Sequence, residues 1–272
     1  MRPSLDPAAR PTVICLHSSA STARQWQALA DRLDPSCRVV APDLSGHGEG
    51  PAWHADDGDI LAADARLVLA LARESAGAVH LVGHSWGGAV ALRAARAEPR
   101  LFASVTAYEP VLFRLLRERG ERRAPGAIVA SIGRALRADL RAGQRLLAAR
   151  RFVDFWNGPG SFAALPAMRQ QAVAARMHAV TAHFASLWND EAKLADYARL
   201  GMPVRLYAGA RTHAATRLIV ELLGSVLPRA SVRTMTAMGH MGPLTHPNTV
   251  AQAVAAFVTG QLGGEAGIAR AA

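Results

Sequence analysis

The chain has 272 residues, of which 50% are hydrophobic and 19% are charged. This length and composition are typical of one large globular domain, or at most two small ones, with a sizeable core, and they exclude a disordered chain. The formal net charge is +10, and Lys193 is the only lysine among 31 basic residues. A bias of this kind, in a chain rich in alanine, points to GC-rich coding rather than to selection for charge.

No apolar run approaches the roughly 18–20 residues that a membrane span requires. The apolar stretch near the N-terminus is too short for the core of a signal peptide. Two cysteines, Cys15 and Cys37, cannot form a disulfide-rich scaffold, and Cys15 lies inside an apolar run. These features predict a cytoplasmic protein with reduced cysteines.

Short apolar runs that favour strands alternate with longer amphipathic segments that favour helices. Runs that are apolar at successive positions are typical of strands buried on both faces, as in a parallel sheet between layers of helices. The sequence therefore predicts an α/β fold with about six, mostly parallel strands. The predicted strands are residues 12–16, 38–42, 79–82, 104–108, 204–208 and 231–235, and the clearest helices are residues 23–33, 59–76 and 88–97.

One long segment interrupts this alternation. Between Pro110 and Met202 the sequence shows helical periodicity and turns but no convincing strand. Substrate sites in open α/β sheets lie at the carboxyl ends of the strands, which is where such an insertion must sit. We therefore expect a helical cap, residues 111–202, inserted after the fourth strand of a core that comprises residues 1–110 and 203–272.

The positive charge is concentrated in the first part of this insertion. Residues 111–151 contain eleven arginines but only three acidic residues, a local balance of +8. Such a cluster could attract an anionic substrate such as an acyl-CoA. Amphipathic helices commonly carry a solvated charged face, however, and we favour that interpretation. Aromatic residues make up only 6% of the chain, which argues against stacking on nucleic acid.

The strongest chemical signal is the Gly-His-Ser-Trp-Gly sequence at residues 83–87. This G-x-S-x-G pattern follows an apolar strand directly and precedes an alanine-rich helix. A tight strand-to-helix turn of this type projects the serine hydroxyl above the sheet and directs backbone amides from the helix towards the same space. We therefore predict Ser85 as a nucleophile.

A serine hydroxyl is a weak nucleophile at neutral pH and needs a neighbouring base that an acid orients. Of the ten histidines, His240 is the best candidate because it lies in a glycine-containing loop just beyond the last predicted strand. His246 is a distant second, since it lies at the predicted start of the final helix. His84 is expected to point away from Ser85.

Four short motifs follow the first, second, third and last predicted strands. They read LHSS at 16–19, PDLSGHG at 42–48, GHSWG at 83–87 and GH at 239–240. In this combination and order the chain resembles the α/β-hydrolase superfamily over nearly its whole length, and within it the capped single-domain bacterial hydrolases, a branch that includes esterases, perhydrolases and dehalogenases. The resemblance implies the α/β-hydrolase fold. Because only about a dozen residues precede the first strand, we expect the usual N-terminal antiparallel hairpin to be absent.

The acid of the triad departs from the family pattern. It usually follows the strand at 204–208 in a Gly-x-x-Asp loop, but here Thr212 occupies the aspartate position, and threonine carries no charge to stabilise an imidazolium. Some family members take the acid from the end of the preceding strand, where this chain has Glu109. The resemblance therefore implies Glu109 as the acid. Two alternatives remain: Glu109 could pair with a cap arginine such as Arg114, and Asp43 could supply the acid, although that aspartate usually ties down its own loop.

The same resemblance implies an oxyanion hole built from two backbone amides, those of Trp86 and Ser19. Ser18 replaces the glycine that usually follows the histidine of this motif. Aromatic residues of the cap are expected to line an apolar acyl pocket. The candidates for substrate contact are Ser18, Trp26, Phe113 and Trp156.

A serine nucleophile favours acyl transfer, whereas dehalogenases of this fold use an aspartate. We therefore expect a cofactor-independent serine hydrolase, without a metal site, that cleaves a small ester, thioester or lactone through an acyl-enzyme on Ser85. A non-hydrolytic ligand-binding or sensing protein stays open because Thr212 replaces the aspartate, and a cofactor-free perhydrolase stays open as well. The expected partner is a small-molecule acyl substrate, not nucleic acid or a membrane, and the oligomeric state is left open.

Overall fold

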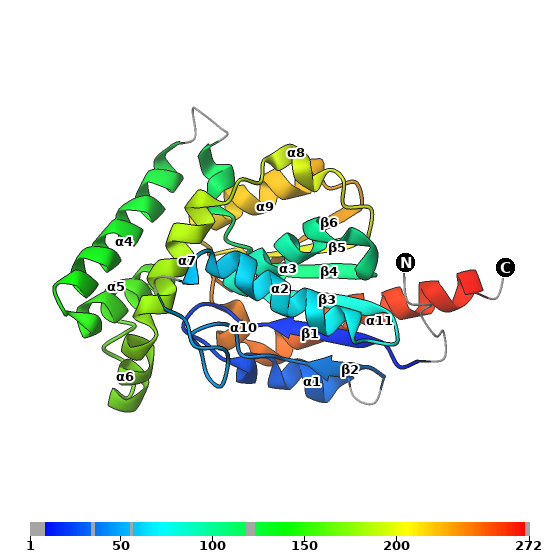
Figure 1. Ribbon diagram of the computed structural model, residues 1–272, viewed down its shortest axis with the longest axis horizontal. Coiled ribbons are helices and arrows are strands. Elements are labelled where there is room, and N and C mark those ends of the chain that lie inside the picture. Colours follow the sequence, from blue (N-terminus) through cyan, green and yellow to red (C-terminus); the bar gives the residue numbers. More distant parts are fainter. Residues whose placement is uncertain (1–8, 34–35, 55–56, 118–122, 270–272) are drawn as a thin grey trace.

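Six parallel strands form one sheet in the computed structural model, which describes residues 9–33, 36–54, 57–117 and 123–269. The strand order is β2-β1-β3-β4-β5-β6, with helices on both faces (Figure 1). The predicted α/β-hydrolase fold is confirmed, and among the described residues the sheet contains no antiparallel strand. The strands are β1 (Thr12–Leu16), β2 (Arg38–Val40), β3 (Val79–His84), β4 (Ser104–Tyr108), β5 (Val204–Gly209) and β6 (Ala230–Met235).

The predicted strands match the observed ones closely. β1 and β4 have the predicted bounds, while β3 and β5 extend beyond them towards the site. β2 ends two residues earlier than predicted, ahead of Pro42, which has no N–H to donate to a neighbouring strand.

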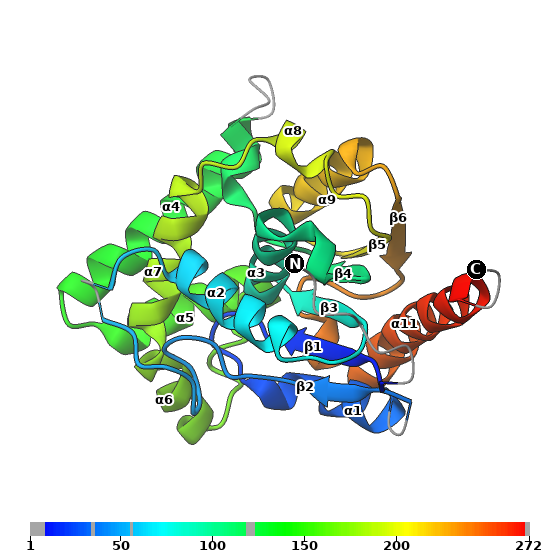
Figure 2. The same ribbon diagram turned by 45° about the vertical axis from the view of Figure 1, so that its right-hand side comes forward.

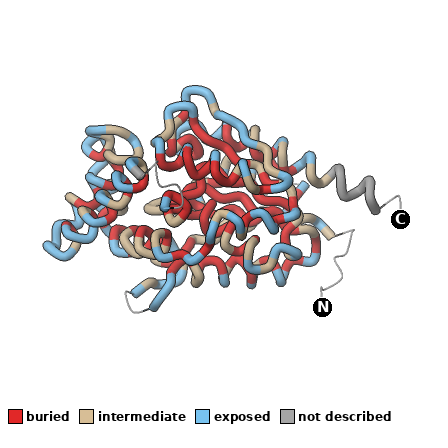
Figure 3. The backbone as a smooth tube through the Cα atoms, turned by 90° about the horizontal axis from the view of Figure 1, so that it is seen from above, coloured by how far each residue is buried: buried red, intermediate tan, exposed pale blue. Residues whose placement is uncertain are grey.

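Side chains of successive strand residues point to opposite faces, so the sheet has two cores. On one face Ile14 and Leu81 belong to one apolar cluster with side chains of α2 (Ile60–Arg73), α3 (Trp86–Ala97) and α9 (Ala214–Val226). On the other face Val13 and Val82 pack against α1 (Gln27–Leu33) and α11 (Pro247–Ala269). Figure 3 shows that the buried residues run through the strands between these layers. Burial on both faces explains why β1 and β3 show no alternation of apolar and polar residues, whereas the edge strands β2 and β6 are partly exposed.

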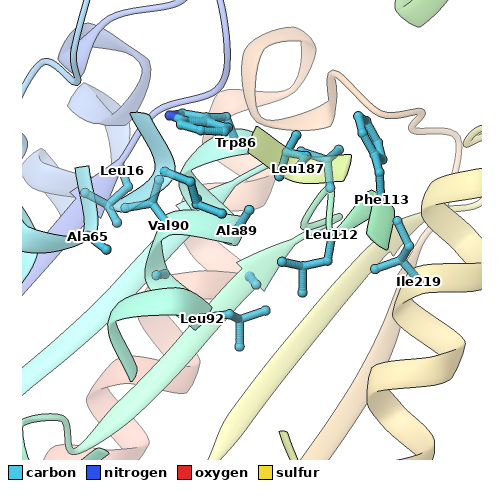
Figure 4. Close-up of a cluster of buried hydrophobic side chains, with 14 of the residues drawn as sticks. Leu16, Ala65, Trp86, Ala89, Val90, Leu92, Leu112, Phe113, Leu187 and Ile219 are labelled. Carbon is cyan, nitrogen blue, oxygen red and sulfur yellow. The ribbon is translucent and has the colours of Figure 1, made fainter. Parts of the chain in front are cut away.

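The segment between β4 and β5 is helical, as predicted. Its described elements are η4 (Phe113–Arg117), α4 (Arg123–Arg141), α5 (Arg145–Asn157), α6 (Ala167–Ala175), α7 (Met177–Asn189) and α8 (Leu194–Tyr197). Helices α4, α5 and α6 lie at one end of the molecule, and the C-terminal end of α11 lies at the other (Figures 1 and 2). Side chains of this segment are continuous with the core: Figure 4 shows Trp86, Leu187 and Phe113 along one edge of the same apolar cluster.

An ion-pair network also joins the end of α7 to α3. The carboxylate of Asp190 lies 2.7 Å from a guanidinium nitrogen of Arg93 and 3.5 Å from one of Arg96. Because the Asp190 side chain is only 4% exposed, these partners compensate a charge that would be costly to bury alone. No helix within the described residues is long and apolar enough to cross a membrane.

Candidate active site

Ser85 occupies a strained turn between β3 and α3. Its backbone has φ 54° and ψ −112°, a region that residues with a side chain seldom adopt and that costs about 1–3 kcal/mol. The amide of Ser85 donates to the Tyr108 carbonyl at 3.0 Å, which ties the turn to the neighbouring strand. A Cβ atom at Gly87 would lie 2.2 Å from the Leu16 carbonyl oxygen, and one at Gly83 would lie 2.3 Å from the Gly87 oxygen. The turn therefore requires both glycines.

We expect Gly87→Ala to lower the free energy of unfolding by several kcal/mol, because the added methyl group collides with rigid backbone. Urea denaturation followed by tryptophan fluorescence measures this change. Gly201→Ala is the matched control, since a Cβ atom there meets nothing within 4 Å, and its stability should stay within about 0.5 kcal/mol of the unmodified protein. Equal stability of the two variants would contradict the steric requirement at the turn.

Ser85, His240 and Glu109 form a continuous hydrogen-bonded series. His240 Nε2 lies 2.9 Å from Ser85 Oγ, and His240 Nδ1 lies 2.7 Å from Glu109 Oε2. The side chains of His240 and Glu109 are 3% and 0% exposed. Because Nδ1–H donates to the carboxylate, Nε2 is left as the acceptor for the serine hydroxyl proton. This is the arrangement that a serine nucleophile and its base require.

Glu109 is held by three donors. Its Oε1 accepts from the Gly209 amide at 2.6 Å, and its Oε2 accepts from the Thr212 hydroxyl as well as from His240. Glu109 itself has φ 45°, so the residue leaves the strand in a left-handed turn that directs its side chain back towards His240. Among the described residues its ion-pair partner is His240. Thr212 occupies the position where the family has its aspartate. Its hydroxyl contacts the carboxylate of Glu109, so this position supports the acid and does not supply it.

Asp43, the rival acid, serves its own loop. Its two carboxylate oxygens accept from the amides of Ala23 at 2.6 Å and Glu49 at 2.9 Å. Partial burial acts to raise the pKa of Asp43, but these two amide bonds, together with the nearby His17 and Arg176, outweigh it and the pKa is lowered overall. A carboxylate committed to these amides does not orient His240.

The other candidate bases lie elsewhere. His246 is exposed and its Nδ1 bonds the Thr245 hydroxyl at 2.8 Å. His84 points away from Ser85, and its Nε2–H donates to the backbone carbonyl of His240 at 2.8 Å. Burial, and then the nearby His240, holds the pKa of His84 well below its usual value. A neutral His84 thus supports the backbone of the loop that carries His240.

The two amides expected to form an oxyanion hole come from separate segments. Trp86 is the first residue of α3, so helix geometry leaves its amide without an acceptor in the preceding turn. The Ser19 amide likewise has no acceptor among the described residues. The indole N–H of Trp86 donates to the buried carboxylate of Asp64 at 2.9 Å, which fixes the ring at the start of the helix.

A narrow cavity lies against Ser85 and His240. Three of the predicted contact residues line it: Ser18, Phe113 and Trp156. The ring of Trp156, from the end of α5, covers His240 at a centroid distance of 4.2 Å. The complete lining is Ser18, Ser19, Ser85, Val111, Phe113, Phe152, Trp156, His183, Phe184, Leu187, His240 and Met241.

The prediction that Trp26 contacts the substrate is wrong. Trp26 is 3% exposed and packs with Leu29, Leu33 and Val13 in the core on the other face of the sheet. Its neighbours recur three and seven residues further on, which is one face of a helix. This spacing marks Trp26 as a core residue and could have been recognised.

The sequence reasoning missed His183, a fully buried residue of α7. Its Nδ1 lies 2.8 Å from the Ser19 hydroxyl, and its ring stacks on Trp86 with centroids 3.7 Å apart and planes 7° from parallel. Burial, and then the nearby His47, holds its pKa well below the usual value, so the ring is neutral near pH 7. Nothing in the local sequence marks this histidine, because its partners are distant in the chain.

This chain is similar to known proteins in sequence and in fold. The family model described as alpha/beta hydrolase family matches residues 13–253. Lipase LipV of Mycobacterium tuberculosis is 37% identical over 103 residues, which cover 37% of each chain. Protein phosphatase methylesterase 1 of Mus musculus is 35% identical over 94 residues, which cover 32% of this chain and 24% of the methylesterase.

These matches span only about a quarter to somewhat more than a third of the two curated relatives. The fold match is far longer. The alpha/beta hydrolase MGS-M2, from a deep-sea metagenome library of the Medee basin, superposes with a TM-score of 0.75 over 96% of this chain and 91% of its own, at 14% identity. With a family match that covers most of its length, this chain belongs to the alpha/beta hydrolase family.

Proposed function

We propose that this protein is a serine hydrolase that cleaves small carboxylic esters, thioesters or lactones through an acyl-enzyme on Ser85. The observation that carries the proposal is the buried series from Ser85 through His240 to Glu109, with contacts of 2.9 and 2.7 Å. Lipase and methylesterase relatives support hydrolysis of an ester bond. No cofactor takes part in this scheme.

The mechanism follows from the atoms in place. Ser85 Oγ attacks the acyl carbonyl carbon while His240 Nε2 takes the hydroxyl proton, and Glu109 stabilises the resulting imidazolium. The amides of Trp86 and Ser19 stabilise the tetrahedral oxyanion. His240 then gives its proton to the leaving alkoxide or thiolate, and a water activated by the same nitrogen releases the acid.

The helical segment 111–202 would act as a cap over this site. It supplies Val111, Phe113, Phe152, Phe184 and Leu187 to the cavity wall, and these side chains are apolar. A narrow cavity with this lining favours a short apolar acyl group.

The test uses a fluorophosphonate probe, which reacts with an activated serine whatever the natural substrate. We expect one adduct, located on the Ser85 peptide by mass spectrometry and absent from Ser85→Ala. Unlabelled portions of the same preparations are assayed with 4-nitrophenyl acetate, and with acetate plus hydrogen peroxide to detect peracid formation. Failure of the folded protein to form the adduct would overturn the proposal and favour a binding or sensing role, whereas dominant peracid formation would favour a perhydrolase.

The cavity also predicts a chain-length preference. We expect kcat/KM for 4-nitrophenyl esters to fall at least tenfold from butyrate to octanoate, since each extra methylene must displace packed side chains. Trp156→Ala should reduce this discrimination, because it removes the ring that covers His240. Phe257→Ala, on α11 and outside the cavity lining, is the control. An octanoate preference in the unmodified protein would contradict the assignment of this cavity to the acyl group.

A further inference from the structure

We propose that His183 is a positioning residue that holds both oxyanion donors. Through this residue the inserted helical segment helps to set the geometry of the oxyanion hole. The inference rests on the proposed function. Its basis is that one side chain from α7 contacts the side chains of both residues whose amides face the reaction, Ser19 and Trp86.

The contact with Ser19 is a hydrogen bond. His183 Nδ1 and Ser19 Oγ are 2.8 Å apart, and they belong to residues separated by 164 positions in the chain. Ser19 lies in the loop after β1 and has only intermediate exposure. A bond to its side chain restricts rotation of the residue, and this fixes the direction of its amide.

The contact with Trp86 is a close parallel stack. The two ring centroids are 3.7 Å apart and the planes are 7° from parallel. The Trp86 ring is also held at its edge by the Asp64 carboxylate, 2.9 Å from the indole nitrogen. His47 stacks with His183 at 5.2 Å and 14°. Trp86 is thus fixed by a hydrogen bond in its plane and by the His183 ring on its face.

The loop that carries Ser19 has a second tie to the insertion. Arg176, directly before α7, donates to the Ala20 carbonyl at 3.2 Å, and the Ala20 amide donates to His47 Nε2 at 2.9 Å. Ala20 has φ 60°, so this loop holds a non-glycine residue in a left-handed conformation. A strained backbone persists only where its surroundings determine it. The bonds from Arg176 and to His47 are among the contacts that do so here.

Two substitutions separate the hydrogen bond from the stack. His183→Phe keeps an aromatic ring beside Trp86 but removes the bond to Ser19, whereas His183→Asn can keep a polar atom near the place of Nδ1 and removes the ring. We expect His183→Phe to lower kcat about tenfold to hundredfold with little change in KM, less than the loss of a whole oxyanion donor. Restored hydrogen bonding should let His183→Asn recover part of that loss. His178→Phe is the matched control, because His178 is an exposed residue of the same helix.

The inhibition constant of a transition-state analogue distinguishes a positioning role of His183 from a purely structural one. A trifluoromethyl ketone forms a tetrahedral oxyanion on Ser85, so its inhibition constant should worsen in His183→Phe by the same factor as kcat/KM. The inhibition constant of the carboxylate product should stay unchanged. Equal weakening of both ligands would overturn the positioning role.

A double-mutant cycle tests the link to Ser19, which is only partly buried. Ser19→Ala removes the same bond from the loop side, and we expect the double variant with His183→Phe to be no slower than the worse single variant. Additive effects on kcat would overturn the link. Failure of the unmodified protein to label with fluorophosphonate would instead defeat the proposed function, so the two failures are distinguishable.

Discussion

Glu109→Gln is expected to lower kcat about 10³–10⁴-fold without unfolding the protein. The amide of Gly209 can only donate, so the glutamine oxygen must take its place facing that amide. The glutamine NH₂ group then faces His240 Nδ1 and donates to it. This moves the imidazole proton to Nε2, where it blocks proton transfer from Ser85.

Substitutions at Thr212, which contacts Glu109, also test whether Glu109 is the acid. Thr212→Asp alone brings two carboxylates together around His240 and should lower activity, because Thr212 contacts Glu109 directly. In the Glu109→Gln background the same aspartate supplies a charge at the place the family usually uses, and we expect kcat to rise at least about tenfold above that of Glu109→Gln. Thr212→Val, which loses only a hydroxyl, is the matched control, with an effect of a few fold.

Stopped-flow measurement of 4-nitrophenol release gives kcat for each variant and tests whether Glu109 is the acid. Only variants whose circular dichroism matches that of the unmodified protein are compared. Near-normal turnover by Glu109→Gln would remove Glu109 as the acid. The Asp43→Asn variant would then be the next to measure. The structure argues against that outcome, since both Asp43 oxygens already accept backbone amides.

The parts of the fold that depend on local pattern were predictable from the sequence. Apolar residues at successive positions identified β1 and β4 with their observed bounds, and the glycines on either side of Ser85 identified the turn that carries it. Glu109 could be selected because the resemblance to the α/β-hydrolases implies an acid at the end of β4, and the carboxyl ends of parallel strands meet at one edge of the sheet. The sequence could not show that the Thr212 hydroxyl bonds this carboxylate.

Residues that act through distant contacts could not be predicted. His183 lies in a helix that also contains His178, Phe184 and Trp188, and only the folding of the insertion onto the loop after β1 and onto α3 brings it to Ser19 and Trp86. The prediction for Trp26 was wrong for a different reason. An aromatic residue near a catalytic loop suggested substrate contact, but the packing of its helix on the far face of the sheet decides its place.

Mild acid is expected to unfold this protein, because several histidines are buried in their neutral form. Burial lowers the pKa of His17 to about 4, of His47 to about 3 and of His80 to about 4. In the unfolded chain a histidine has its ordinary pKa near 6.5. Between pH 6.5 and about 4 the unfolded state therefore binds more protons than the folded state, and the free energy of unfolding falls as the pH falls. Above pH 6.5 these groups leave stability independent of pH.

Each such histidine contributes a slope of about 1.4 kcal/mol per pH unit within that window. We expect urea midpoints measured at steps from pH 8 to pH 4.5 to be flat above pH 6.5 and to fall steeply below it. His80→Asn is the informative variant, because His80 Nδ1 bonds the Ser104 hydroxyl at 2.8 Å while its Nε2 has no partner among the described residues. A proton added there would have no acceptor, so removal of this one histidine should reduce the slope by about one proton even if it lowers stability at pH 8.

The matched variant His178→Asn removes an exposed histidine of α7 and should leave the slope as it is in the unmodified protein. A pH profile without a fall between pH 6.5 and 4.5 would contradict the neutral burial of these histidines. It would also weaken the case for a neutral His183 beside Ser19, because that residue is buried by the same packing and its low pKa has the same first cause. The acid profile therefore tests, without any substrate, the protonation state on which the geometry around Ser85 depends.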